Sequence, residues 1–226
     1  MEKANYGKLN ILAAGLGMGL FGVCSIDKEV ERFHKDIRER ARSLDYAICM
    51  GLPLSREIFE TITDGPNDIY KTHYRQANAM LDNATFMLSK NIESQGFRAL
   101  PIPASFTVDE KMQTGHLSHK WLAEKAGLGW RGRNNLLVTE KFGSAVRLTT
   151  ILTDMPLMTN TPVEFGCGDC YDCVAECPAE ALGEMPSDYN FDRCYSQILK
   201  YSRRNNYGLM ICGHCIKACL PKTKRK

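Results

Sequence analysis

The spacing of the cysteines constrains this chain more than any other feature. Eight of the ten cysteines lie between Cys167 and Cys219. The first part of this segment reproduces the bacterial [4Fe–4S] run, including its closing proline. Cysteines with two residues between them on a tight loop can place their thiolates around one cubane. The fourth cysteine, on the following helix, reaches a neighbouring cluster. The run reads Cys167-x2-Cys170-x2-Cys173-x3-Cys177-Pro178.

A second set of four cysteines follows, with 17 residues between its first two members. It comprises Cys194, Cys212, Cys215 and Cys219, and ends in Leu220-Pro221. Because the fourth cysteine of each set serves the other cluster, the spacing predicts two crossed ligand sets. Cluster one would use Cys167, Cys170, Cys173 and Cys219, and cluster two would use Cys177, Cys194, Cys212 and Cys215.

Two other uses of the thiols compete with this interpretation. Two Cys₄ zinc sites would also consume eight thiolates, but the three-cysteine run with its x3-Cys-Pro ending favours iron–sulfur clusters. Disulfides need an oxidising compartment, of which the N-terminal sequence gives no sign. Cys24 and Cys49 lie in apolar, strand-like runs and are predicted to be buried core thiols.

The shift in cysteine content predicts two domains, 1–160 and 161–226, joined near the loop 158–162. In the first, apolar residues at steps of three and four predict an amphipathic helix over 74–95, with its methionines as core fillers. Short β-type runs surround this helix, so the fold class is α/β or α+β. The runs are 20–26, 46–50, 97–100, 136–139 and 146–152.

The segment Gly127-Leu-Gly-Trp-Arg-Gly132 spells G-x-G-x-x-G, the dinucleotide fingerprint. The fingerprint needs a strand before the glycines and a helix after them. Here the order is reversed, because a helical run over 116–126 comes first and a strand follows. Gly127 is predicted to end that helix. The other two glycines are predicted to lie in a loop whose backbone can come close to a neighbouring group, because glycine has no Cβ. An NAD-type site is disfavoured, whereas a flat or phosphorylated cofactor stays open, with Arg131 and Arg133 suited to anionic edges.

Charge and hydropathy limit the possible partners. Four of the 29 basic residues lie in the last five positions, which leaves 25 basic against 26 acidic residues in the body. A nearly neutral body argues against a broad nucleic-acid surface, and the basic tail is predicted to be a solvated end. The apolar stretch 11–24 is too short to span a membrane and lacks a cleavage signal, so a cytoplasmic protein is expected.

These motifs together resemble the epoxyqueuosine reductase family, relatives of the corrinoid-dependent reductive dehalogenases. The likeness covers about 115–221, including Gly143-Ser144 and the segment Ile151-Leu-Thr-Asp154-x-Pro156-Leu157. It implies a nitroreductase-like α/β domain, then a small ferredoxin-like domain with two [4Fe–4S] clusters feeding a corrinoid. By position, the residues expected against the corrin are Gly129, Trp130, Gly132 and Asn134.

The chain departs from this family in two ways. The position of the family's acidic proton donor holds Gln113, whose amide cannot supply a proton. His116, one helical turn further on, is the replacement we expect, because histidine exchanges protons near pH 7; His119 and Lys120 would share its helical face. The chain also ends seven residues after Cys219, where the resemblance implies a further helical-repeat segment that grips tRNA, and this disfavours a tRNA substrate.

Two functions follow. The first is a corrinoid-dependent reductase that takes electrons from a ferredoxin- or flavodoxin-type donor and cleaves a small-molecule or modified-nucleoside substrate. The second is an electron-transfer or corrinoid-handling protein without substrate chemistry of its own. The size of the first domain, far beyond what a simple ferredoxin needs, favours the reductase. FMN in place of cobalamin is a variant of either, because nitroreductase-like folds commonly hold it.

Overall fold

The structure is a computed structural model that describes residues 1–204 and 207–222. Contacts divide the described chain into two compact units. The first unit comprises 1–53, 77–128 and 147–163, and the second comprises 54–76, 129–146 and the described residues from 164 onward. The consecutive domains 1–160 and 161–226 stay a prediction. Lys224, Arg225 and Lys226, which belong to the predicted solvated tail, lie outside the described residues.

The elements alternate between helix and strand, which confirms the α/β class. Two of them are short 3₁₀ helices, marked η. In chain order the elements are α1 (Glu2–Gly15), β1 (Leu20–Ser25), η1 (Val30–Arg32), α2 (Lys35–Ala41), β2 (Tyr46–Pro53), α3 (Arg56–Glu60), α4 (Asp68–Ser94), β3 (Ala99–Ile102), α5 (His119–Lys125), β4 (Trp130–Arg131), β5 (Leu137–Val138), β6 (Val146–Thr153), α6 (Asp172–Ala175), η2 (Pro186–Asp188), α7 (Phe191–Arg203) and α8 (His214–Ala218).

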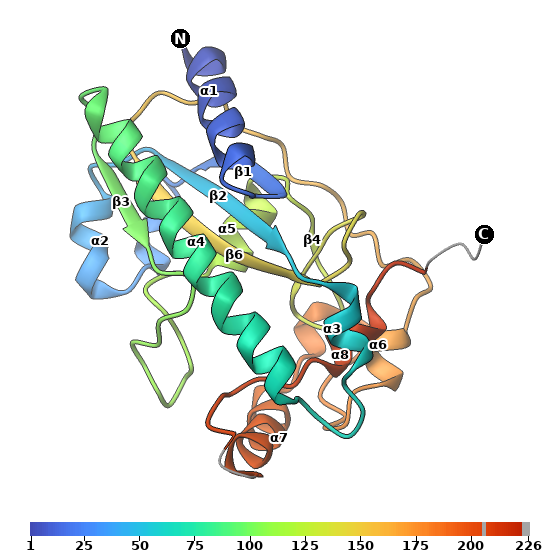
Figure 1. Cartoon of the computed structure of the whole chain (residues 1–226). Coiled ribbons are helices and arrows are strands. Elements are labelled where there is room, and N and C mark those ends of the chain that lie inside the picture. Colours follow the sequence, from blue (N-terminus) through green and yellow to red (C-terminus); the bar gives the residue numbers. More distant parts are fainter. Residues whose placement is uncertain (205–206, 223–226) are drawn as a thin grey trace. The chain divides into compact units, whose positions relative to one another are not determined.

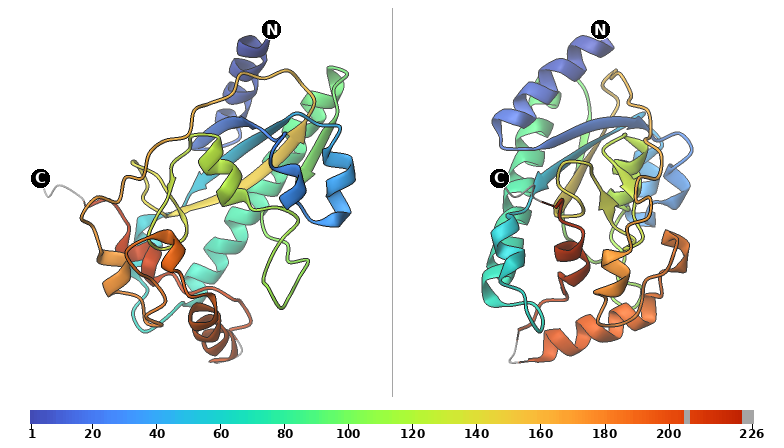
Figure 2. Two further views of the ribbon diagram at one scale, coloured as in Figure 1. Left: turned by 180° about the vertical axis from the view of Figure 1, so that it is seen from behind. Right: turned by 90° about the vertical axis from the view of Figure 1, so that its right-hand side faces the viewer.

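The first unit is built on a four-stranded sheet in the order β1-β2-β6-β3. Strands β1 and β2 pair antiparallel with Gly22 opposite Cys49, and β3 pairs antiparallel with β6. The sheet carries α1 and α4 on one face and α5 on the other (Figures 1 and 2). The strand predicted to stop before Pro101 continues through it, because β3 is an edge strand where a missing N–H is tolerated.

Helix α4 confirms the predicted amphipathic helix and begins earlier, at Asp68, where the Asn67 side chain accepts the N–H of Tyr70 at 2.9 Å. Its buried stripe packs on the sheet in the core of the first unit. The two methionines predicted as core fillers, Met80 and Met87, are instead about half exposed. The stripe consists of Leu81, Ala84, Leu88 and Ile92.

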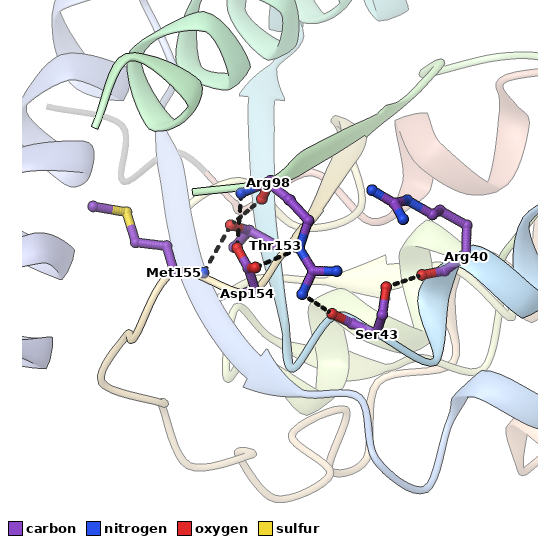
Figure 3. A network of polar contacts seen from close by, with 6 residues as sticks. All are labelled: Arg40, Ser43, Arg98, Thr153, Asp154 and Met155. Atoms are coloured by element: carbon purple, nitrogen blue, oxygen red, sulfur yellow. Dashed lines mark hydrogen bonds and ion pairs between the residues drawn. The ribbon is translucent and has the colours of Figure 1, made fainter. Parts of the chain in front are cut away.

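A polar network ties the start of β3 to the end of β6 (Figure 3). The Arg98 backbone N–H and Nε donate to the carboxylate of Asp154 at 2.8 and 2.5 Å, and its Nη2 donates to the Ser43 carbonyl at 2.6 Å. The Thr153 hydroxyl donates to the Arg98 carbonyl at 2.7 Å. Asp154, part of the segment that carries the family resemblance, therefore has a structural use in the first unit.

Candidate iron–sulfur site

The second unit gathers all eight cysteines of the C-terminal segment. Cys167 and Cys170 lie in a loop, Cys173 in α6, and Cys177 just beyond that helix. The second set is spread over α7, a loop and α8, with its last member directly after α8. Its members are Cys194, Cys212, Cys215 and Cys219.

The electrostatic neighbours of the thiols show how these residues are grouped. Burial raises the pKa of Cys173 to about 11, and the next contributions come from Cys219, Cys167 and Cys170. The thiol of Cys219, from the second set, thus lies among those of the first.

The complementary group is centred on Cys215. Burial raises the pKa of this thiol well above its ordinary value, followed by the charges of Cys212 and Cys194 and then those of Cys173 and Cys177. Cys212 shows a pKa raised to about 11 by burial, with added contributions from Cys194 and Cys177. The fourth cysteine of the first run is therefore a neighbour of the second set.

The chemistry of the donors matches an iron–sulfur ligand set, because soft thiolates bind Fe–S clusters and zinc. Within the described residues, no three His, Cys, Asp or Glu side chains lie close enough together to hold a single metal ion. Each group contains four cysteines, which is the number of thiolates that ligate one [4Fe–4S] cluster.

Hydrogen-bond donors surround several of the sulfurs. The Trp130 indole N–H donates to Cys167 Sγ at 3.3 Å, and the Ala181 backbone N–H to Cys177 Sγ at 3.4 Å. The Ser144 hydrogen bonds oppose the burial that raises the pKa of Cys219. Such contacts to sulfur adjust the reduction potential of a cluster.

The glycine segment forms a hairpin between β4 and β5, where only a loop followed by a strand was expected. A Cβ on Gly129 would lie 2.1 Å from the Val138 carbonyl oxygen. On Gly132 it would lie 2.4 Å from a Val138 methyl and 3.6 Å from Cys167 Sγ. The close approach predicted for these glycines is therefore to the protein's own hairpin, and the contact with a corrin stays a prediction.

Asn134 and Arg133 are also engaged within the second unit. The buried Asn134 amide donates to the Ser144 hydroxyl at 2.9 Å. Arg133 donates to the carbonyls of Cys170 and Gly168 at 3.1 and 2.9 Å. Its guanidinium group also lies 4.0 Å from the centre of the Tyr171 ring. Arg133 thus holds the cysteine loop, a use that its sequence position did not reveal.

Two further residues beside the sulfurs were missed. His214 Nδ1 lies 3.2 Å from Cys212 Sγ, and its Nε2 donates to the Thr63 carbonyl at 3.1 Å. Burial and a hydrogen bond with Cys194 raise the pKa of Tyr189. The position of His214 inside the Cys212-x2-Cys215 segment could have indicated its role, whereas nothing in the local sequence marks Tyr189.

His116 lies in the first unit, in a bend before α5, which begins at His119 because the Ser118 hydroxyl accepts the N–H of Trp121 at 3.3 Å. The expectation that His116 opens this helix and shares a face with His119 and Lys120 is therefore wrong. The His116 ring is half-buried and stacks on Phe106, with ring centroids 5.6 Å apart.

His119 is half-buried and has the contacts of a neutral histidine. Its Nε2 donates to the Pro103 carbonyl at 3.0 Å, and its Nδ1 accepts from the Thr150 hydroxyl at 2.8 Å. Burial lowers its pKa to about 4, so the ring is neutral rather than imidazolium at neutral pH and is poorly suited to act as a general acid.

The two remaining cysteines, Cys24 and Cys49, are buried in the first unit, as predicted. Burial, and then the neighbouring Cys24, raise the pKa of Cys49. The Cys49 thiol therefore stays protonated at neutral pH.

Comparisons with known proteins identify a class of reductases. No protein-family model matches the chain. The chain is 45% identical over 71 residues to epoxyqueuosine reductase from Listeria monocytogenes, covering 31% of this chain and 19% of that protein. It is 28% identical over 190 residues to tetrachloroethene reductive dehalogenase from Sulfurospirillum multivorans, covering 78% of this chain and 35% of that one.

Solved structures of both kinds share the fold. A reductive dehalogenase described in connection with B12-dependent dehalogenation superposes with a TM-score of 0.77 and 19% identity, over 97% of this chain and 32% of the other. Epoxyqueuosine reductase bound to a modified tRNA stem loop gives 0.60 and 20% identity, over 86% and 57%. The chain is thus a homologue of epoxyqueuosine reductases and reductive dehalogenases, as its motifs predicted, and the sequence matches span about a fifth to a third of those two relatives.

Proposed function

We propose that this chain is an iron–sulfur oxidoreductase that binds two [4Fe–4S] clusters through crossed ligand sets and reduces a substrate with the help of a corrinoid. The observation that carries the proposal is the exchange of one cysteine between the two sets. After burial, the charge of Cys219 contributes most to the raised pKa of Cys173, and that of Cys177 contributes to the raised pKa of Cys215. This exchange is the arrangement that two-cluster ferredoxins use.

The residues that would hold the clusters are the eight cysteines of the second unit. When bound, such clusters supply one-electron transfer at low potential. The chain's own groups fix the surroundings of the sulfurs: Trp130 donates a hydrogen bond to Cys167, and Arg133 anchors the loop that carries Cys167 and Cys170.

The corrinoid and the substrate are proposed from the relatives. One structural neighbour is described for B12-dependent dehalogenation, and another was crystallised with an epoxyqueuosine-modified stem loop. By analogy with these two neighbours, we propose a substrate with a carbon–halogen or carbon–oxygen bond, which is either a small molecule or a modified nucleoside. We assign His116 the role of proton donor in place of Gln113. A cytoplasmic location stays a prediction; no helix among the described residues is long and apolar enough to cross a membrane.

The ligand sets are tested with anaerobically reconstituted protein. We expect about eight iron atoms per chain from two cubanes, and stoichiometric zinc without iron would refute the clusters. In electron paramagnetic resonance spectra, Cys177→Ala should perturb a different cluster from Cys167→Ala. Loss of the same signal in both variants would refute the crossed ligation.

The second cofactor is tested by titration with cobalamin and, separately, with FMN under reducing conditions, followed by the visible spectrum. Saturable cobalamin binding supports the proposal. Binding of FMN alone would replace the corrinoid with a flavin, and binding of neither would favour an electron-transfer protein without substrate chemistry.

A further inference from the structure

The charges of the C-terminal segment are separated along the chain. Residues 161–192 contain eight Asp and Glu and no Lys or Arg, whereas residues 193–226 contain nine Lys and Arg and no Asp or Glu. The change falls within the first turn of α7, between Asp192 and Arg193. A helix that carries Cys194 thus also begins the basic part of the chain.

Helix α7 presents part of this charge on one exposed face. Arg193, Lys200 and Arg203 are exposed, and their spacing of seven and three residues keeps them on one side of the helix. The eleven residues from Arg193 to Arg203 span about 15 Å of helix. Among the described residues, neither Lys200 nor Arg203 forms an ion pair. These three residues are called the basic row.

Arg204 differs from the basic row. It directly follows the last residue of α7 and lines a hollow of about 320 Å³ together with Asp64 and Asp68. The hollow is also lined by Tyr201 and Tyr207. The unbalanced positive charge of α7 is therefore confined to the basic row.

The end of α7 is in contact with the surroundings of the second thiol group. The Tyr201 ring lies nearly parallel to the ring of His214, at 8° with centroids 6.2 Å apart. His214 in turn lies 3.2 Å from Cys212 Sγ. A continuous series of side-chain contacts thus joins the helix of the basic row to a thiol of cluster two.

We propose that the basic row is the docking surface for an acidic, low-potential electron-carrier protein. This inference rests on the proposed function, because the docked carrier would give one electron to cluster two and be oxidised by one electron. Charge complementarity of this kind increases the rate of encounter and orients the partner. The contacts from Tyr201 to Cys212 place the docking surface beside the group that would receive the electron.

An RNA strand is the other partner that a basic row could bind. The structure favours a protein, because three cations over about 15 Å match one acidic patch.

The test measures binding of holoprotein to two immobilised probes, an acidic flavodoxin and an acidic ferredoxin, at low and at high salt. The variant Lys200→Glu/Arg203→Glu should bind the preferred probe about tenfold more weakly, as expected when two rim charges become repulsive. The control Lys3→Glu/Lys8→Glu makes the same change in net charge on the exposed face of α1, and its affinity should change less than about twofold.

Equal losses in the two variants, or no saturable binding of either probe to the wild type at low salt, would overturn the docking surface. It would also be overturned if the α7 variant lost affinity for a tRNA stem loop while its affinity for both probes was unchanged. Iron content and the spectrum after dithionite reduction, measured on the same samples, report separately on the proposed clusters.

Discussion

The indole N–H of Trp130 points at the sulfur of Cys167, 3.3 Å away. This contact links the glycine hairpin to a thiol of the proposed first cluster. A hydrogen bond to a cluster sulfur stabilises the reduced, more negative state, and thereby raises the reduction potential.

Trp130→Phe should therefore lower the potential of cluster one by about 20–60 mV, the equivalent of about 0.5–1.5 kcal/mol for one electron. A potentiometric titration followed by electron paramagnetic resonance measures the shift. The matched control is Trp121→Phe, because the N–H of that indole donates to Glu29 in the first unit. Unchanged potentials in Trp130→Phe would show that the N–H contact has no effect on the cluster.

His119 should make the protein less stable as the pH falls from about 6.5 towards 4. Its pKa is lowered to about 4 in the folded chain, whereas an unfolded histidine titrates near 6.5. Between these values the unfolded state binds the extra proton, so folding stability decreases on acidification by up to about 1.4 kcal/mol per pH unit. Denaturant unfolding between pH 6.5 and 5 should show a shallower dependence in His119→Gln, and identical slopes would contradict the prediction.

Asp154→Asn should destabilise the first unit by about 1 kcal/mol at neutral pH, a value reduced for the exposure of Arg98. Burial raises the pKa of Asp154, but the hydrogen bonds and the charge of Arg98 outweigh it and leave the pKa below its usual value. The contribution is therefore present above about pH 4 and is lost as the pH falls through the lowered pKa. The control is Glu39→Gln, which removes the solvent-exposed ion pair between Glu39 and Arg42. This change should have little effect on the free energy of unfolding.

His116→Gln should slow turnover by about 10²- to 10⁴-fold, the usual contribution of a positioned acid. Cluster content and cofactor affinity should stay unchanged, because His116 lies in the first unit and contacts Phe106 and His34. Single-turnover kinetics with chemically reduced protein measures the effect. Wild-type rates in the variant would assign the proton to another group.

The sequence predicted the four strands of the main sheet and the helices α4 and α5, because their signals are local. The apolar stripe of α4 and the β-branched runs of the sheet each follow from neighbours within a few residues. The start of α5 was misplaced by three residues, because the cap at Ser118 outweighs the helical pattern around His116. The strand β4 was missed for a different reason: its pairing with β5 depends on Gly129 accommodating the Val138 carbonyl.

The residues of the candidate site likewise include some that local sequence predicts and others that depend on the fold. The candidate ligands could be predicted from the cysteine spacing, because cysteine is the residue type that supplies a thiolate. The role of Arg133 arises from a contact between distant segments, 37 residues apart for Arg133 and Cys170, and no local pattern encodes it. Tyr189 lies near its partner Cys194 in the sequence, but its residue type does not mark it as part of a thiol site. Asn134 was assigned to the cofactor by position, and this stays a prediction; its amide donates to the Ser144 hydroxyl.

The position of Cys219 among Cys167, Cys170 and Cys173 also bears on how the protein is made. On a ribosome, three of these sulfurs emerge some fifty residues before the fourth. The other set likewise waits for Cys212 and Cys215 after Cys177 has emerged. Neither proposed ligand set is complete until the final stretch of chain has been synthesised, so a premature stop codon anywhere before position 212 would remove ligands of both proposed clusters rather than of one.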